Sequence, residues 1–281
     1  MTGYVRPATL ADAVSARADH PDWMVLAGGT DLMVEAPLRP RPLGIIDLWA
    51  LPELTGIDRD GDAIRIGAGT SWLEVTVDPM IAVDAPILAA AAREIGALQI
   101  QARGTIGGNI ATSSPVGDSL PALLALDAEL ELVSPRGARR LPYADFATGY
   151  RKTLLAGDEL VAAVRLPKPL PGTWFGWRKV GTRRAQSISK VMAAAALTIE
   201  GGTITRARFG LGAVADRPIR APAAENAAVG GRRDHATADK VAAAAVASIT
   251  PISDVRSTAS YRLELVQRLL MRFVIGQGDR T

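Results

Sequence analysis

The pattern of apolar and polar positions predicts a chain that mixes helices with strands. Apolar residues recur at helical spacing over residues 8–18, 85–100, 237–249 and 257–275. Thr9 is placed to cap the first of these helices, and Pro86 fits the first turn of the second. Strands are predicted at residues 23–27, 43–48, 63–69, 190–200 and 203–214. Residues 119–134 predict a helix that turns into a strand, with Leu130 and Leu132 on one face.

Two domains are expected, because 281 residues exceed the usual size of one domain. The proline cluster RLPKPLPGTW at 165–174 interrupts the periodic pattern and is the best candidate for the boundary. The prediction is therefore an α+β protein with one domain at 1–170 and a smaller α+β domain at 171–281.

Composition removes several classes of function. The sequence has no cysteine, which excludes iron–sulfur clusters, thiolate zinc sites and a cysteine nucleophile in this chain. His20 and His235 lie in polar, turn-like contexts and are expected at the surface, so no metal site is predicted. A net charge of +3 without a basic, aromatic-rich face argues against nucleic-acid binding. No apolar run is long enough for a membrane span and no secretion signal is visible, so we expect a cytoplasmic protein.

Two glycine pairs are the features that point to a ligand. Residues 25–32 read VLAGGTDL, and residues 105–118 read TIGGNIATSSPVGD. Each pair leads into small side chains that can donate hydrogen bonds, including Thr30, Asn109, Thr112, Ser113 and Ser114. Because glycine has no Cβ, backbone N–H groups in such loops can approach an anion and form a concave nest. Two loops facing each other would suit a diphosphate, and so a dinucleotide bound outside the Rossmann mode.

Each of these features also has an ordinary explanation. A glycine pair alone is most often a tight turn. Asp118 could cap a helix that begins near Ser119. Lys179 could be a solvated strand residue, and Arg151 and Lys152 could be surface charges or a subunit contact.

The chain resembles the flavin-binding subunit of the molybdenum hydroxylases, the family of xanthine dehydrogenase, aldehyde oxidase and carbon monoxide dehydrogenase. The resemblance rests on LAGGTDLM, TIGGNIATSSPVGDSLPALLALDAELEL, GYRKTLL, WRKVGTRRAQSISKV and DVRSTASYRLELVQRLL, which follow the family's order from about residue 4 to 275. It implies the two-subdomain FAD-binding fold of the PCMH or vanillyl-alcohol oxidase type, followed by a smaller C-terminal α+β domain.

The resemblance also implies which residues bind FAD. The first segment supplies Leu26, Ala27, Gly28, Gly29, Thr30, Asp31 and Leu32, and the second supplies Thr105, Ile106, Gly107, Gly108, Asn109 and Ser113. Asp118 matches a flavin-contacting aspartate, Lys179 a lysine beside the isoalloxazine ring, and Val161 a residue that packs on the ring. Ile95 matches a position where an aromatic residue can occur, so its stacking contact is expected to be weaker here.

The implied function is electron transfer within a larger enzyme, with no catalytic residue for the substrate in this chain. Electrons would arrive from [2Fe–2S] clusters in one partner, after substrate oxidation at a molybdopterin in another, and would leave to an acceptor such as NAD⁺. A xanthine dehydrogenase-like dimer of heterotrimers is expected. Two alternatives remain open at this point: a self-contained FAD oxidase of the vanillyl-alcohol oxidase type, and a scaffold without a cofactor.

Overall fold

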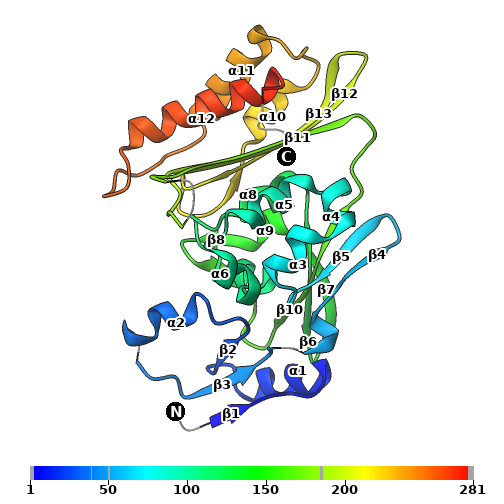
Figure 1. Cartoon of the computed structure of the whole chain (residues 1–281), viewed down its shortest axis with the longest axis vertical. Helices are drawn as coiled ribbons and strands as arrows, with labels where there is room; N and C mark the ends of the chain where they lie inside the picture. The colour runs from blue at the N-terminus through cyan, green and yellow to red at the C-terminus, as the bar shows by residue number, and fades with distance from the viewer. Residues whose placement is uncertain (1–2, 39, 50, 184–185, 278–281) are drawn as a thin grey trace.

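The molecule consists of three layers stacked along its long axis (Figure 1). The computed structural model describes residues 3–38, 40–49, 51–183 and 186–277. The N-terminal segment forms the first layer, a larger sheet with its helices forms the second, and the C-terminal segment forms the third. The mixture of helices and strands matches the α+β prediction.

The first layer is a small parallel sheet with one helix. Its strands are β1 (Gly3–Val5), β2 (Met24–Leu26) and β3 (Gly44–Asp47), in the order β1-β3-β2. Helix α1 (Leu10–Asp19) begins as predicted, because the side chain of Thr9 accepts a hydrogen bond from the backbone N–H of Asp12. The short helix α2 (Leu32–Glu35) and the 3-10 turns Ala36–Leu38 and Pro52–Leu54 complete this part of the chain.

The second layer is an antiparallel sheet of five strands in the order β4-β5-β10-β6-β7. These strands are β4 (Ile57–Asp60), β5 (Ala63–Gly67), β6 (Glu129–Ser134), β7 (Gly137–Pro142) and β10 (Leu160–Pro167). Strand β6 buries Leu130 and Leu132 completely, as its alternation predicts. The accompanying elements are α3 (Trp72–Val77), α4 (Pro79–Asp84), α5 (Pro86–Arg93), α6 (Leu98–Arg103), α7 (Ile106–Thr112), α8 (Leu120–Ala125), α9 (Tyr143–Phe146), β8 (Ala147–Gly149) and β9 (Lys152–Thr153).

The single helix predicted over residues 85–100 is wrong in its second half. Helix α5 ends at Arg93, and α6 starts only at Leu98. Gly96 between them has a φ of +55°, a left-handed conformation that ends a helix. The side-chain amide of Gln101 donates hydrogen bonds to the carbonyl oxygens of Arg93 and Ile95, which stabilises the break.

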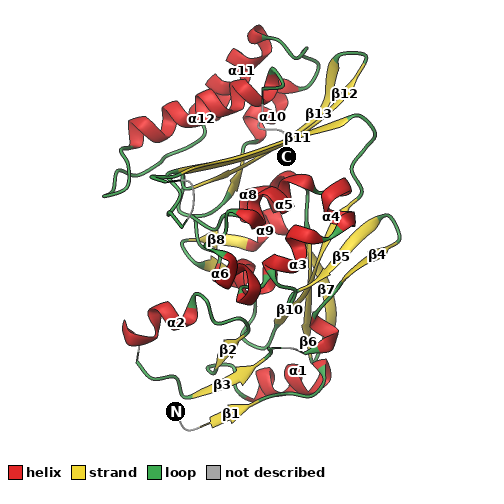
Figure 2. Ribbon diagram, viewed as in Figure 1, coloured by secondary structure: helices red, strands yellow, loops and turns green. Residues whose placement is uncertain are grey.

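The third layer is an antiparallel sheet covered on one face by three helices. Its strands are β11 (Thr173–Val180), β12 (Val191–Glu200), β13 (Thr203–Gly212) and β14 (Ile219–Arg220), in this order. Helices α10 (Pro222–Ala228), α11 (His235–Val246) and α12 (Ala259–Val274) cover the outer face, whereas α5 and α8 lie against the inner face (Figure 2). The predicted stripe on α12 is buried at Val266, Leu269, Leu270 and Phe273. No helix in the described ranges is long and apolar enough to span a membrane.

Helix α8 is the main contact between the second and third layers. It packs on β12 and β13, where the carbonyl oxygen of Pro121 lies only 2.0 Å from the position that a Cβ of Gly210 would take. Ion pairs flank the helix at both ends. Asp118 before it pairs with Lys179 at 2.7 Å, and Asp127 after it pairs with arginines of the third layer, namely Arg206, Arg208 and Arg220.

We predict that Gly210→Ala destabilises the protein, because the added methyl group overlaps the carbonyl oxygen of Pro121. Overpacking of this kind lowers the free energy of unfolding by roughly 1–3 kcal/mol. Chemical denaturation measures the effect. Gly157→Ala is the control, because a Cβ at Gly157 makes only an ordinary contact of 3.6 Å with Pro21. Equal unfolding free energies for the two variants would contradict the close packing of α8 on β13.

Candidate functional site

A cavity of about 1040 Å³ lies where the three layers meet. Its wall includes Val25 and Leu48 of the first layer, Ala68 and Leu160 of the second, and Ala213 of the third. This volume is at the upper end of the range of roughly 300–1,000 Å³ that small-molecule and cofactor sites occupy. The cavity therefore has room for a ligand as large as a dinucleotide.

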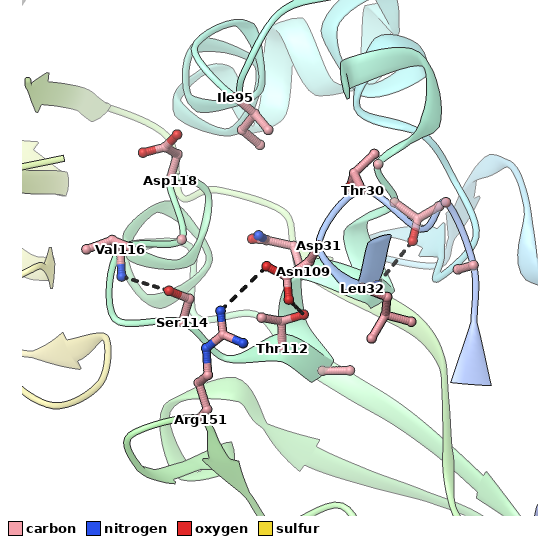
Figure 3. Close-up of a pocket in the computed structure, with 18 of the residues that line it drawn as sticks. Thr30, Asp31, Leu32, Ile95, Asn109, Thr112, Ser114, Val116, Asp118 and Arg151 are labelled. Carbon is pink, nitrogen blue, oxygen red and sulfur yellow. Dashed lines mark hydrogen bonds and ion pairs between the residues drawn. The ribbon is translucent and has the colours of Figure 1, made fainter. Parts of the chain in front are cut away.

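Both glycine pairs contribute to this cavity, although they are far apart in the sequence. Figure 3 shows Thr30 and Asn109, which directly follow the two pairs, on the same cavity. The residues predicted for the site that line the cavity are Ala27, Gly28, Gly29, Thr30, Asp31, Leu32, Ile95, Thr105, Gly107, Gly108, Asn109, Asp118 and Val161. Four predicted residues do not line it: Leu26, Ile106, Ser113 and Lys179.

The first glycine segment presents free backbone donors. Within the described residues, the N–H groups from Gly28 to Leu32 make no hydrogen bond to protein atoms. Gly29 has a φ of +75°, which favours glycine. Gly28 is required by packing within the protein and not by a ligand, because a Cβ at this position would lie 1.6 Å from the carbonyl oxygen of Arg103. The segment is thus packed tightly on the end of α6 while its N–H groups stay available to an acceptor.

The second glycine pair lies in a helix, so the prediction of a second loop is wrong. Thr105 caps α7, and its hydroxyl accepts from the N–H of Gly108 at 3.1 Å. The N–H of Gly107 donates to the carbonyl of Ala68 at 2.8 Å. Because these donors are already used, only the first of the two glycine pairs offers free N–H groups. A Cβ at Gly107 would collide with Ala68, whereas one at Gly108 would meet only the Thr105 hydroxyl, at 3.0 Å.

The four predicted residues that do not line the cavity lie next to residues that do. Ile106 is fully buried in the core of the second layer, and Leu26 ends strand β2. Ser113 follows α7 in a left-handed conformation with a φ of +47°, and its buried hydroxyl has no hydrogen-bond partner. Lys179 reaches the site only through Asp118.

Asp118 and Lys179 form a buried ion pair at one end of the cavity. The side chains are 13% and 4% exposed, and the ammonium group also donates to the carbonyl oxygen of Glu94 at 3.1 Å. The hydroxyl of Ser189 donates to the second carboxylate oxygen of Asp118 at 2.8 Å. Burial raises the pKa of Asp118, and Lys179 and Ser189 act in the opposite direction. Asp118 therefore is no helix cap, and Lys179 is no solvated strand residue.

Three of the four arginines that line the cavity share one feature, and none of them was predicted for the site: Arg17, Arg151 and Arg262. Each has a buried Nε–H that makes no hydrogen bond, and they account for three of the six buried side-chain polar atoms without a partner among the described residues. Buried donors are normally paired. The other nitrogens of these guanidinium groups do bond protein acceptors, namely the carbonyl oxygens of Trp23 and Lys190 and the carboxylate of Glu35, which hold the three side chains in the wall. The sequence signals were two of the family motifs: GYRKTLL contains Arg151, and DVRSTASYRLELVQRLL contains Arg262.

The described residues hold no group of three or more His, Asp or Glu that could bind a metal ion. His20 stacks on Trp23 with ring centroids 3.8 Å apart, and His235 is exposed at the start of α11. Neither histidine lines the cavity.

Comparison with known proteins identifies the class. Residues 1–169 match the model of the FAD binding domain in molybdopterin dehydrogenase, and residues 178–276 match the CO dehydrogenase flavoprotein C-terminal domain. The chain is 35% identical to the carbon monoxide dehydrogenase medium chain of Afipia carboxidovorans, covering 96% of this chain and 94% of that one. It is 34% identical to the xanthine dehydrogenase FAD-binding subunit of Escherichia coli O157:H7, with the same coverage. The solved carbon monoxide dehydrogenase of Hydrogenophaga pseudoflava superposes with a TM-score of 0.92 at 32% identity, covering 96% of this chain and 94% of that one.

The chain belongs to the family of FAD-binding medium subunits of the molybdenum hydroxylases. The cavity fits FAD on physical grounds. It has the necessary volume, a run of free N–H groups for a diphosphate, and arginine side chains in its wall.

We predict that Gly108→Ala folds normally and loses FAD affinity. The added methyl group stays in a helix, where alanine is favoured over glycine, and is close only to the Thr105 hydroxyl. Because Gly108 lines the cavity, the added methyl group takes up space that FAD would occupy. FAD titration into the apoprotein measures the affinity. Gly28→Ala is the contrast, because its methyl group would collide with the backbone of Arg103 and lower the thermal unfolding temperature. Unchanged flavin affinity in Gly108→Ala would contradict this geometry.

We also predict a pH-dependent defect in Lys179→Met. A carboxyl whose pKa is raised in the folded state contributes stability at low pH and loses it as the pH rises through the folded pKa. Removal of Lys179 raises the pKa of Asp118 further, because burial then acts without the neighbouring ammonium group. The loss of unfolding free energy relative to wild type should therefore be larger at about pH 8 than at about pH 5, and removing one partner of a buried pair costs roughly 3–5 kcal/mol.

Denaturant unfolding at both pH values measures this defect. The double variant Lys179→Met/Asp118→Asn is the control, since it has no carboxyl to titrate and its difference from wild type should change little with pH. A defect in Lys179→Met that is equal at both pH values would show that Asp118 is not the responsible group.

Proposed function

We propose that this chain transfers electrons from the [2Fe–2S] clusters of a partner subunit, through FAD, to an acceptor such as NAD⁺, in a xanthine dehydrogenase-like enzyme. The observation that supports this most is one cavity that combines free N–H groups at Gly28–Leu32 with the buried pair Asp118–Lys179. The first can hold a diphosphate, and the second is a fixed, buried ion pair at one end.

In this proposal the domain at 1–170 holds FAD, and the domain at 171–281 closes one end of the site. The residues proposed to bind or support FAD are Leu26, Ala27, Gly28, Gly29, Thr30, Asp31, Leu32, Ile95, Thr105, Ile106, Gly107, Gly108, Asn109, Ser113, Asp118, Val161 and Lys179. Bound FAD would supply the ability to accept electrons singly and release them in pairs. Ile95 offers an aliphatic surface where relatives can carry an aromatic ring, so we expect a purely van der Waals contact there.

The ion pair gives Lys179 a defined role. Its ammonium group is held by Asp118 and by the carbonyl oxygen of Glu94, so its position is fixed before any ligand enters. A fixed positive charge stabilises negative charge nearby without reorganisation. Lys179 offsets the carboxylate of Asp118, which lines the cavity, so we expect it to favour the reduced, more negative state of the cofactor relative to a site with Asp118 alone.

The composition of this chain supports the proposal that the iron–sulfur clusters are in another subunit. This chain has no cysteine to hold an iron–sulfur cluster. The proposed assembly is a cytoplasmic complex with an iron–sulfur subunit and a molybdopterin subunit, duplicated as a dimer of heterotrimers. Because electron transfer needs close approach, the iron–sulfur partner should contact the surface near the two glycine segments.

We predict that the purified, FAD-loaded chain oxidises no purine or aldehyde by itself. It should join the cluster-bearing and molybdopterin subunits on co-expression. Sizing with absorbance spectroscopy tests assembly, and substrate assays with and without the partners test activity. Substrate turnover by the isolated chain would contradict the proposal and support the stand-alone oxidase, which the family membership does not favour.

A further inference from the structure

Asp31 places a carboxylate in the wall of the proposed FAD site. It lies within the segment Gly28–Leu32, whose N–H groups are free, and it lines the cavity. A carboxylate beside a diphosphate opposes its binding, because two negative charges in a partly buried site repel each other strongly. An unpaired Asp31 would therefore work against the N–H groups around it.

Arg151 makes the one ion pair to Asp31 among the described residues. Its Nη2 lies 3.5 Å from Oδ1 of Asp31, and the hydroxyl of Thr112 donates to Oδ2 of Asp31 at 3.4 Å (Figure 3). Arg151 also bonds Glu35 through Nη1 at 2.5 Å. Glu35 does not line the cavity, whereas Asp31 and Arg151 do. Glu35 thus anchors the guanidinium group, and Asp31 is the carboxylate whose charge faces the ligand.

The backbone of Arg151 is held in an unusual conformation. The residue lies between β8 and β9 with a φ of +51°, which costs free energy for any residue other than glycine. Its side chain is only 28% exposed, and the Nε–H is buried without a partner. A strained backbone and a confined side chain are more than a solvated surface arginine requires.

We infer that Arg151 is a positioning residue for FAD: its guanidinium group, which is shared between Glu35 and Asp31, offsets part of the charge of Asp31, so that the free N–H groups of Gly28–Leu32 dominate the local potential. The inference rests on the proposed function, since it takes the FAD diphosphate as the anion in the cavity. Arg151 acts here through Asp31 and needs no contact with the cofactor.

The test is titration of FAD into the apo form of the full-length chain, followed by flavin fluorescence. Arg151→Met should weaken FAD binding about tenfold, a typical size for coupling between close charges. Asp31→Asn keeps the backbone N–H, the group of Asp31 proposed to hold the diphosphate, and removes the opposing carboxylate charge, so it should bind FAD at least as tightly as wild type. The double variant Arg151→Met/Asp31→Asn should return to within about twofold of Asp31→Asn, because the charge that Arg151 compensates is then absent.

Two further measurements separate charge compensation from loss of structure. The defect of Arg151→Met should shrink as salt is raised to about 1 M, where the Debye length is about 3 Å. Arg151→Lys should keep most of the affinity. Arg59→Met is the matched control, because Arg59 pairs with Asp84 at 2.7 Å but does not line the cavity, and its FAD affinity should equal that of wild type.

The outcomes distinguish this inference from the proposed function. A wild-type chain that fails to bind FAD overturns both. If wild type binds FAD, normal affinity in Arg151→Met overturns the inference alone. A defect that persists unchanged in the double variant also overturns it, because Arg151 then acts by packing or direct contact rather than through Asp31.

Discussion

The contact between α8 and the C-terminal sheet is the constraint on which the site depends. Gly210 lets the carbonyl oxygen of Pro121 approach β13 closely. Asp118 and Asp127, just before and after the helix, pair with Lys179 and with a group of three arginines. Lys179 can meet Asp118 only when the C-terminal domain sits in this position. The same packing that joins the two layers therefore also completes one end of the cavity.

Glycine has two different uses around this cavity. Gly28 and Gly107 are needed because protein atoms occupy the space of their missing Cβ atoms, the backbone of Arg103 and residue Ala68 respectively. Gly108 has no such neighbour apart from the Thr105 hydroxyl. The first two bring segments close enough to form the wall, and the third leaves room for a ligand. A sequence motif alone cannot distinguish these two uses, because both appear in the sequence simply as glycine.

Much of the local structure could be predicted from the sequence. Thr9 caps α1, Pro86 opens α5, and Leu130 and Leu132 alternate into the core, since these features depend on neighbouring residues or on simple periodicity. The break at Gly96 was not predicted, because alanine-rich spacing continues across it and the carbonyl groups it leaves free are bonded by Gln101. The helix after Thr105 was missed because two glycines oppose helix formation locally.

The sequence by itself determined the donor-rich glycine segments, the lack of cysteine and the family resemblance, because each depends on residue type and order. Only the tertiary structure decided that the free N–H groups belong to Gly28–Leu32, since those of Gly107 and Gly108 are bonded within the protein. It also decided the ion-pair partners of Lys179 and Arg151. Each residue would read as an ordinary surface charge in isolation, and each is paired with a carboxylate more than fifty positions away, Asp118 or Asp31. Such pairings arise from packing between layers, which local sequence patterns do not encode.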